Sequence, residues 1–391
     1  MFSEKVLLQQ PLSNATGTPM TKSKPTIGLC MIVKNEAPVI RRCLDSVLPA
    51  ISHWVIVDTG STDGTQDIIR AHLSNVPGVL YEREWQDFAH NRSESLALAR
   101  AHTDYSLVID ADDFLEPLDA LDVPELTHDC YTLDIIDPPL RYIRKQLVNN
   151  RLLWRYRGVL HEFIDCEQEH SVGHWPWPMR RNHDGARRRD VHTFDKDAQV
   201  FLRALETEQD PFLRSRYTFY LAQSYRDSQQ LQEAITFYQQ RAQMGGWQEE
   251  VFYSLYQVAK LKEDLGLPDE EVLAAYEAAS QSSSTRIEAL HGASRLCRIR
   301  GRYAQGMAFA QRGLARPYPA DALFGQPWIY ETGLLDEFAV NAYWVGHYTE
   351  CLDACLQIVR TEKMSGADLQ RVVDNAHYAL QKITALMAVQ S

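Results

Sequence analysis

The sequence predicts two domains of different fold class, an α/β domain over residues 25–190 and an all-helical repeat domain over residues 191–391. Two observations predict this division. Short apolar runs alternate with helical segments up to about residue 136, which is typical of βαβ units around a largely parallel sheet. From about residue 191, small and aromatic residues recur at a spacing of about 34 residues, as in arrays of paired helices. Residues 1–24 are mostly polar, and we expect a flexible tail there.

The α/β domain is predicted from a series of apolar runs and the helices between them. The runs are nearly all apolar, which indicates a sheet with helices on both faces. The stretch from residue 137 to 190 is rich in Arg, Trp, His and Pro, and it predicts short strands and loops, including a strand at Gly158–Leu160. We expect strands at Ile27–Val33, Trp54–Val57, Val79–Tyr81, Tyr105–Ile109 and Cys130–Ile136, and helices at Ala37–Leu48, Thr65–Leu73 and Phe88–Ala101.

The helical domain is predicted from four units of small and aromatic residues. They are Tyr217, Tyr220, Leu221, Ala222, Tyr225, Ala234 and Tyr238; Tyr253, Tyr256, Ala259, Ala274 and Tyr276; Ala289, Ala293, Leu296, Tyr303 and Ala308; and Phe338, Ala342, Tyr343, Tyr348 and Leu352. This pattern resembles tetratricopeptide repeats, whose arrays usually present a concave binding surface. A Pro-rich insertion at residues 317–327 interrupts the series. The alternative is a generic helical layer that only completes a core.

Composition and charge narrow the class of function. The formal net charge is -12, which disfavours a broad nucleic-acid surface because such a surface needs a basic face. The seven cysteines are scattered without a CxxC pair, and we interpret Cys351 and Cys355 as reduced core thiols. No run approaches the roughly twenty apolar residues of a membrane span, and no signal peptide is apparent. These features predict a cytoplasmic protein.

The strongest candidate for chemistry is the acidic cluster Asp110, Asp112 and Asp113, which directly follows an apolar run. Carboxylates this close raise one another's pKa unless a cation is present. The end of a buried strand is also where α/β proteins hold ligands. Oxygen ligands favour a hard cation, Mg²⁺ or Mn²⁺, that binds substrate phosphates as well. The alternative is a solvated turn in which Asp113 caps a following helix.

Two further acidic residues are predicted at the same edge of the sheet. Asp58 ends a strand and opens the Gly-rich and Ser/Thr-rich turn of residues 58–65, where its carboxylate could accept a base N–H or a ribose hydroxyl. The alternative is a βα turn with Asx-turn and N-cap chemistry. Glu36 follows the first strand, and its alternative is a first-turn glutamate that complements the helix dipole.

Taken in order, the segments at 33–36 (Val-Lys-Asn-Glu), 58–65 (Asp-Thr-Gly-Ser-Thr-Asp-Gly-Thr) and 110–112 (Asp-Ala-Asp) resemble the family 2 glycosyltransferases, which have the GT-A fold. The resemblance covers roughly residues 25–190. Within the family the chain looks most similar to the lipooligosaccharide β-1,4-glucosyltransferase branch and its repeat-bearing relatives. That branch has counterparts of Phe88–Arg92 and of His161–Glu162, and often carries tetratricopeptide-like helices. A peptide S-glycosyltransferase of the sublancin type looks like a more distant cousin.

The resemblance implies a nucleotide-diphospho-sugar donor, UDP-linked, with Mn²⁺ or Mg²⁺. It implies that Asp58 recognises the base and Glu36 supports the nucleoside. Arg92 would contact the diphosphate or base, Asp110 the ribose or a metal-bound water, and Asp112 the metal directly. The family pattern needs only the outer two carboxylates, so the resemblance leaves the role of Asp113 open.

The catalytic base is predicted less directly. Inversion needs a carboxylate that takes the acceptor proton. Glu162 is the first candidate and Asp184 the second, and the alternative for Glu162 is a salt bridge to a nearby arginine. His183 is a candidate metal ligand or diphosphate donor, within an arginine-rich stretch that includes Arg181. Guanidinium groups suit phosphate oxygens, so we expect one or two of these arginines to bind phosphate.

Together these features predict a metal-dependent inverting hexosyltransferase, of the EC 2.4 class, acting on a protein, peptide or glycan acceptor. The repeats would contact the acceptor or mediate a homodimer. The alternative is a non-catalytic tetratricopeptide scaffold with a decayed transferase domain. A glycosidase also uses two carboxylates, but it needs neither a metal site nor a nucleotide-type sheet edge.

Overall fold

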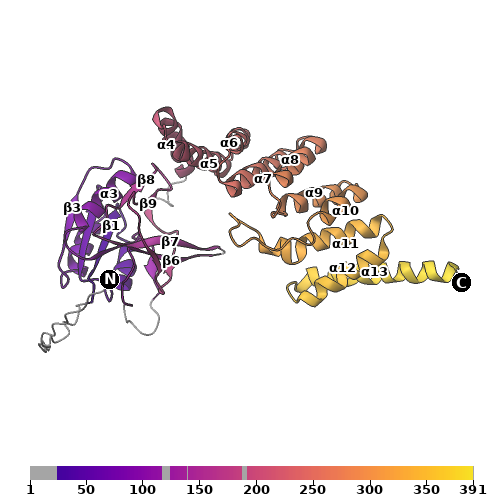
Figure 1. Cartoon of the computed structure of the whole chain (residues 1–391), viewed down its shortest axis with the longest axis horizontal. Helices are drawn as coiled ribbons and strands as arrows, with labels where there is room; N and C mark the ends of the chain where they lie inside the picture. Colours follow the sequence, from indigo (N-terminus) through magenta and orange to yellow (C-terminus); the bar gives the residue numbers. More distant parts are fainter. Residues whose placement is uncertain (1–23, 117–123, 139, 187–191, 391) are drawn as a thin grey trace, which may run out of the picture. The chain divides into compact units, whose positions relative to one another are not determined.

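A computed structural model of the chain describes residues 24–116, 124–138, 140–186 and 192–390, which form two compact units (Figure 1). The first unit comprises the described residues up to Tyr156 together with Ile164–Ala186. The second comprises Arg157–Phe163 and the described residues from 192 onward. The predicted tail up to residue 23 and the predicted domain boundary near residue 190 lie outside the described residues.

The first unit is built on a mixed sheet that is parallel around its centre. Strands β3, β2, β1 and β4 run parallel, β7 pairs antiparallel with β4 and β6, β11 and β10 pair parallel with β6, and β5 pairs antiparallel with β11. The strands in chain order are β1 Ile27–Val33, β2 His53–Asp58, β3 Gly78–Glu82, β4 Tyr105–Val108, β5 Phe114–Leu115, β6 Cys130–Asp137, β7 Leu140–Asn149, β10 Val172–His174 and β11 Met179–Arg180. The prediction of a largely parallel α/β fold is confirmed.

Alternating side chains of the central strands supply two separate cores, one on each face of the sheet. On one face Leu29 of β1 packs in a cluster with Ile40 and Leu44 of α1 (Ile40–Val47). On the other face Cys30 packs in a cluster with Leu96 of α3 (Phe88–Ala99). Helix α2 spans Thr65–His72. Burial on both faces explains why the central strands read as continuous apolar runs.

The segment before and after residue 160 differs from the prediction. The predicted strand at Gly158–Leu160 is wrong, because β8 (Arg155–Arg157) ends directly before Gly158 and no strand follows until Phe163. Gly158 has a φ of 100° and His161 a φ of 50°, and neither value is compatible with an extended strand. The chain then pairs back on β8 as β9 (Phe163–Asp165).

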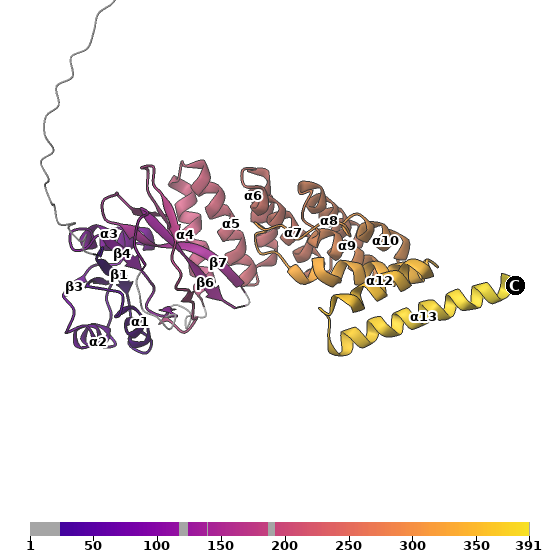
Figure 2. The ribbon, with the colours of Figure 1, turned by 60° about the horizontal axis from the view of Figure 1, so that its bottom comes forward.

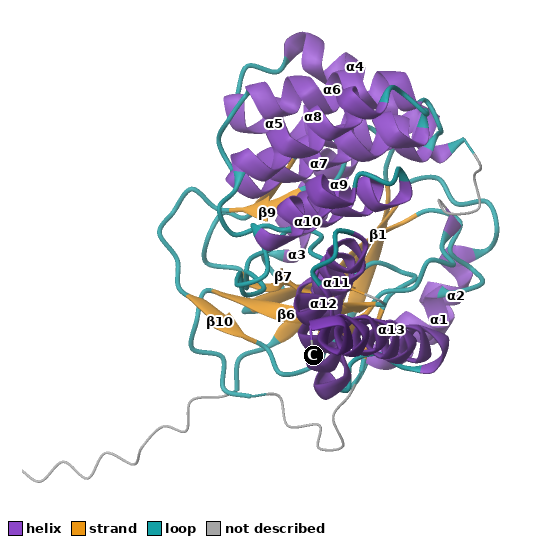
Figure 3. Cartoon of the chain, turned by 90° about the vertical axis from the view of Figure 1, so that its right-hand side faces the viewer, coloured by secondary structure: helices purple, strands orange, loops and turns teal. Residues whose placement is uncertain are grey.

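The second unit is all helical and consists of successive helix pairs (Figures 1 and 2). After β11 the described chain contains only helices and the segments that connect them (Figure 3). The four predicted repeats coincide with α5–α6, α7–α8, α9–α10 and α11–α12. The helices are α4 Thr193–Thr207, α5 Pro211–Asp227, α6 Leu231–Gln243, α7 Gln248–Asp264, α8 Asp269–Ser282, α9 Glu288–Ile299, α10 Tyr303–Gln311, α11 Leu334–Trp344, α12 Tyr348–Thr361 and α13 Gly366–Gln390.

Small residues against aromatic rings hold neighbouring helices of this unit together. A Cβ added at Gly292 of α9 would lie 2.4 Å from the ring of Tyr276 of α8, so only glycine fits this approach. The Pro-rich insertion leads into a single turn of π-helix, η2 (Ile329–Gly333), directly before α11. The tetratricopeptide-like architecture is therefore built from the small and aromatic positions that predicted it.

All seven cysteines are buried free thiols, which agrees with the interpretation of Cys351 and Cys355. Among the described helices, none is long and apolar enough to cross a bilayer.

Candidate active site

Three acidic segments lie at one edge of the sheet in the first unit. Strand β1 pairs in parallel with β2 on one side, where Val33 is opposite Asp58, and with β4 on the other, where Cys30 is opposite Val108. The chain segments that leave the carboxyl ends of these strands carry Glu36, Asp58 and Asp110. Parallel pairing therefore brings these residues to the edge where α/β sheets hold ligands.

The turn after β2 uses only one of the two carboxylate oxygens of Asp58. Oδ1 accepts hydrogen bonds from the backbone N–H groups of Gly60 and Ser61, each at 2.8 Å, and from Gln66 Nε2 at 3.3 Å. Oδ2 is buried and has no hydrogen-bond partner within the described chain. The Asx-turn considered as an alternative is thus present, and it leaves one oxygen available for a ligand.

The segment after β1 joins the turn after β2 to the loop around residue 185. Asn35 donates from its backbone N–H to Ser61 Oγ at 2.8 Å, and its Oδ1 accepts from the Thr62 N–H at 2.8 Å. Both carboxylate oxygens of Glu36 accept from the backbone N–H of Ala186 at 3.3 Å. Glu36 precedes α1 by four residues, so its role as a first-turn residue of that helix is wrong.

Asp110 is the compensated carboxylate of the acidic cluster. Arg92 Nη2 lies 2.5 Å from Asp110 Oδ1, and Arg144 Nη2 lies 4.0 Å from Asp110 Oδ2. Burial raises the pKa of Asp110, but these two cations outweigh burial and lower it to about 2. The guanidinium of Arg92 also lies over the rings of Phe88, one turn earlier on α3, and Tyr156. Stacking on both rings fixes Arg92 at the strand end.

Asp112 and Asp113 are the uncompensated carboxylates of the cluster. Burial and then the charge of Asp110 raise the pKa of Asp112. Asp113 is fully buried, and burial, Asp110 and Asp112 raise its pKa to about 8. Oδ1 of Asp113 accepts a hydrogen bond from the Asn182 N–H at 3.3 Å, and its Oδ2 is another buried oxygen without a partner in the described chain. Cations near these two residues do not balance their charge.

Asp113 does not cap a helix, so that alternative is wrong. Its N–H donates to the Asp110 carbonyl at 3.1 Å, which closes a tight turn. The turn leads directly into β5 (Phe114–Leu115) rather than into a helix. The turn keeps the three carboxylates close together, which is the source of their mutual repulsion.

A loop at residues 182–186 lies against the acidic cluster. A Cβ added at Gly185 would lie 2.6 Å from Asp112 Oδ2, so glycine permits this approach. Arg42 of α1 donates to both carboxylate oxygens of Asp184 at 2.9 Å and to the Asp112 carbonyl at 2.7 Å. Arg42 therefore fixes the loop, and it holds Asp184, the second candidate base, in a bidentate ion pair.

Arg181 and His183 bind a different acid. His183 Nε2 lies 2.7 Å from Asp137 Oδ1, and Arg181 Nη1 lies 3.8 Å from Asp137 Oδ2 and donates to Tyr142 Oη at 3.3 Å. Arg181 is also close enough to the cluster to lower the pKa of Asp110 and Asp112. Within the described residues, no three His, Cys, Asp or Glu side chains form a ready-made metal site. The arginines at 187–189, which follow Arg181 and His183 in the sequence, lie outside the described residues.

His161 and Glu162, expected in the α/β domain, belong to the second unit. The His161 ring stacks on Tyr220 of α5 at a centroid distance of 3.9 Å. The His161 carbonyl accepts from Arg216 Nη2 at 2.6 Å, and Arg157 forms an ion pair with Asp210. The segment that carries Glu162 is thus held by the first helix pair.

Two residues of this edge, Arg42 and Arg144, were not predicted. Arg144 lies on β7, which also carries Arg141 and Lys145 and does not resemble the apolar runs that predicted the other strands. Arg42 carries no sequence signal beyond its place on the first helix. Both contacts depend on elements far apart in the sequence, namely α1 with residues 112 and 184 and β7 with residue 110.

The sheet order and the acidic edge together define the first unit as a GT-A-like α/β domain. Residues 29–203 match glycosyl transferase family 2. The chain therefore contains a family 2 glycosyltransferase domain followed by tetratricopeptide-like helical repeats, and a domain of this family indicates an enzyme of the glycosyltransferase class (EC 2.4).

Similar proteins match only part of the chain. A TPR repeat-containing protein of Synechococcus elongatus is 31% identical over 180 residues, which is 42% of this chain and 43% of that protein. The SPbeta prophage-derived glycosyltransferase SunS of Bacillus subtilis is 36% identical over 88 residues, 22% of this chain and 20% of SunS. The chain thus spans less than half the length of each of these relatives.

Among solved structures, a tetratricopeptide repeat protein of Parabacteroides merdae is 16% identical with a TM-score of 0.34, covering 50% of this chain and 73% of that one. This likeness is too low to carry an argument, and the repeat architecture rests on the helix pairs of the chain itself. None of the similarities to known proteins distinguishes a lipooligosaccharide glucosyltransferase branch.

Proposed function

We propose that the chain is a metal-dependent, inverting glycosyltransferase that moves a hexose from a UDP-linked sugar to a protein, peptide or glycan acceptor. The observation that carries this proposal is the uncompensated acidic edge, where Asp58 and Asp113 each have a buried oxygen without a partner in the described chain. A nucleoside diphosphate with a divalent cation suits this edge, because the cation can bind the carboxylates and the phosphate oxygens can accept hydrogen bonds from the arginines. The similarity to SunS supports the same class of reaction.

The carboxylates fit a divalent cation by their chemistry, because burial and mutual repulsion raise the pKa of Asp112 and Asp113. Asp112 is the proposed direct ligand of Mg²⁺ or Mn²⁺. Asp110 is held by Arg92 and would act through a metal-bound water or the ribose. Such a cation neutralises the charge that develops on the diphosphate leaving group. His183 is the weaker candidate, because its imidazole is hydrogen-bonded to Asp137.

The proposed nucleotide contacts come from the other strand ends. Asp58 Oδ2 is available to accept a hydrogen bond from the base. Glu36 supports the nucleoside from the segment that also holds the turn after β2. Arg92 and Arg181 are the proposed diphosphate contacts, since both are close enough to the cluster to lower the pKa of Asp110.

Glu162 remains the first candidate for the base that takes the acceptor proton. Both oxygens of Asp184 accept from Arg42 at 2.9 Å, so Asp184 would have to leave an ion pair before it could accept a proton. The proton released by the acceptor hydroxyl or thiol would pass to the Glu162 carboxylate as the sugar is attacked.

The proposal is tested by UDP release and by mass spectrometry of products, using a panel of UDP-hexoses, Mn²⁺ and cell extract as the acceptor source. Asp112→Asn removes the ligand charge, and we expect turnover to fall by about 10³-fold or more, since the cation supplies several kcal/mol to the transition state. Asp67→Asn is the matched control, because that carboxylate on α2 is 89% exposed. Wild-type rates for Asp112→Asn would overturn the metal site.

The base is tested separately. We expect Glu162→Gln to lose turnover and to retain UDP binding, whereas Asp184→Asn should weaken UDP and Mn²⁺ binding because it frees the loop that Arg42 fixes. Collapse of UDP binding in Glu162→Gln would assign that residue to donor binding instead.

A further inference from the structure

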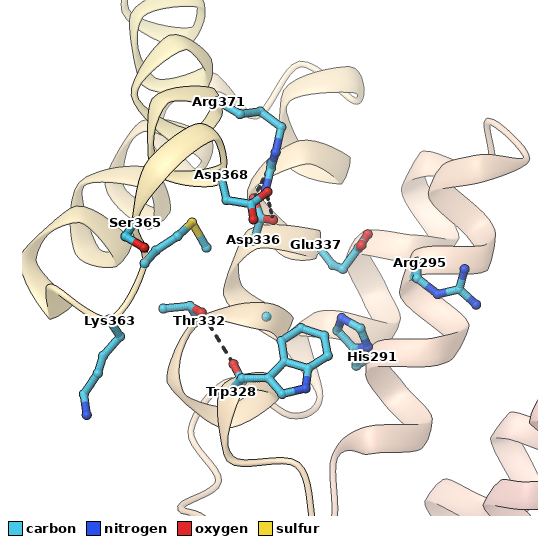
Figure 4. A pocket seen from close by; sticks show the side chains of 12 residues that line it. His291, Arg295, Trp328, Thr332, Asp336, Glu337, Lys363, Ser365, Asp368 and Arg371 are labelled. Carbon is cyan, nitrogen blue, oxygen red and sulfur yellow. Dashed lines mark hydrogen bonds and ion pairs between the residues drawn. The ribbon is translucent and has the colours of Figure 1, made fainter. Parts of the chain in front are cut away.

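The helical unit contains a cavity that no part of the proposed reaction uses. It has a volume of about 420 Å³ and lies among α9, η2, the start of α11 and the start of α13 (Figure 4). This volume is within the range of small-molecule sites. His291, Trp328 and Arg371 line it from three different helical segments (Figure 4).

Trp328 presents a large aromatic surface at this cavity. Trp328 is 51% exposed, although exposure of an indole to water is unfavourable. A Cβ added at Gly333 would lie 2.5 Å from the Trp328 ring, so the indole packs directly on the backbone of η2. The ring also meets His291 edge to face at a centroid distance of 5.0 Å. Single π-helical turns are frequent at functional sites, and here the turn holds a fixed aromatic platform.

His291 presents a polar group at the same place. His291 is only 8% exposed and lines the cavity beside Trp328 (Figure 4). Burial and then the charge of Arg295 lower its pKa to about 4, so the ring is neutral near pH 7. A neutral imidazole offers one donor and one acceptor. At the cavity wall it can therefore donate to one hydroxyl oxygen of a ligand and accept from another hydroxyl.

The charged groups that line the cavity are already in ion pairs, some with each other and some with residues outside the cavity. Arg371 donates to Asp336 at 2.9 and 2.7 Å, and Glu337 accepts two hydrogen bonds from Arg298 at 2.7 and 2.9 Å. Arg295 and Lys363 pair in the same way with Glu263 and Glu331. A charged ligand would have to displace one of these pairs. A neutral ligand rich in hydroxyl groups can hydrogen-bond to both signs without doing so.

We propose that this cavity is a binding site for an uncharged carbohydrate, separate from the donor site of the first unit. The apolar C–H face of a pyranose ring packs on the indole of Trp328. Its hydroxyl groups reach His291 and the paired charges of Asp336 and Arg371. If the chain is the proposed transferase, the site holds a neutral sugar of the acceptor or product glycan, but sugar binding itself does not depend on that activity.

The test is saturation-transfer NMR on the full chain with glucose, galactose, mannose, N-acetylglucosamine, lactose, cellobiose and maltose, followed by titration of the best binder. We expect at least one sugar to bind, and Trp328→Ala to weaken it about tenfold, which is the worth of a good aromatic contact. Trp344→Ala is the matched control, since Trp344 is 59% exposed in the same unit and stacks on Tyr303 away from the cavity. His291→Gln should also weaken binding.

Further binding measurements distinguish this site from the donor site. Asp112→Asn and added UDP with Mn²⁺ should leave the sugar signal unchanged, and UDP binding should survive in Trp328→Ala. Trp328→Tyr keeps a flat ring and should retain part of the affinity, which guards against misfolding of the alanine variant. The proposal is overturned if no neutral sugar binds, if Trp344→Ala weakens binding as much as Trp328→Ala does, or if inorganic phosphate competes at this site.

Discussion

In the helical unit Arg286 is 1% exposed, and its guanidinium pairs with the buried carboxylates of Glu288 and Glu249. In the α/β unit Asp113 is just as buried, yet one of its oxygens has no partner in the described chain, and the closest charges around it include two more carboxylates. Both sites bury ionisable groups away from water. Carboxylates compensate the charge of Arg286 within the fold, whereas the described residues provide no such compensation at Asp113.

A buried charge with partners inside the fold stabilises the fold, whereas a buried charge without partners indicates a binding site for a ligand. A buried ion pair is held by its own geometry, and removing one partner leaves an uncompensated charge. Arg241 and Glu250, also buried, repeat this arrangement with a 2.8 Å contact. The acidic edge instead keeps a repulsion that destabilises the fold, and proteins retain such repulsion where a substrate or cation relieves it.

The largest effect on stability is expected from breaking the compensated cluster. Arg286→Met leaves Glu288 and Glu249 buried without their cation, so the free energy of unfolding should fall by about 3–5 kcal/mol. The measurement is chemical denaturation followed by far-UV circular dichroism. Arg302→Met is the matched control, because the Arg302–Glu270 pair lies at the surface and should matter little. Equal losses in the two variants would show that the buried cluster carries no special weight.

The opposite sign is expected at the acidic edge. Asp113→Asn removes a repelled charge, so in EDTA the variant should be more stable than the wild type, by about 1–3 kcal/mol. Burial and the neighbouring carboxylates raise the folded-state pKa of Asp113 to about 8. The contribution of this residue to the free energy of unfolding is therefore largest below about pH 4 and is lost as the pH rises toward 8. The gain should therefore be absent near pH 4 and grow up to pH 8. Thermal unfolding across this range checks it, and a gain independent of pH would contradict the assigned cause.

A smaller effect is expected from crowding Asp112. Gly185→Ala places a Cβ where Asp112 Oδ2 now lies 2.6 Å away, and the carboxylate must shift. We expect Mn²⁺ to bind about tenfold more weakly, a loss of about 1.4 kcal/mol. The double variant with Asp112→Asn should show no further loss, since both changes act on one carboxylate. Additive losses would place the effect of Gly185 elsewhere.

The sequence predicted those features that depend on local pattern. Strand β1 has the bounds expected from its apolar run, and the placement of Asp58 and Asp110 at one sheet edge follows from parallel pairing. The four helix pairs follow from spacing alone. In each case a short stretch of sequence carries the whole signal.

Features that depend on contacts between distant segments could not be predicted in this way. The Arg42–Asp184 pair joins residues 142 positions apart. Only the folded structure shows that this ion pair occupies the Asp184 carboxylate and so opposes its use as a base. The cavity combines His291, Trp328 and Arg371, which share no motif. The strand expected from the apolar residues at Gly158–Leu160 does not form, because Gly158 and His161 have left-handed backbone conformations.

We propose that Asp112 and its neighbours bind a cation that arrives with the substrate. The most direct measurement is a titration of Mn²⁺ by electron paramagnetic resonance in the presence of UDP, with wild type, Asp112→Asn and the exposed control Asp67→Asn. We expect saturable Mn²⁺ binding that survives in Asp67→Asn and is lost in Asp112→Asn. Unchanged Mn²⁺ affinity in Asp112→Asn would contradict it.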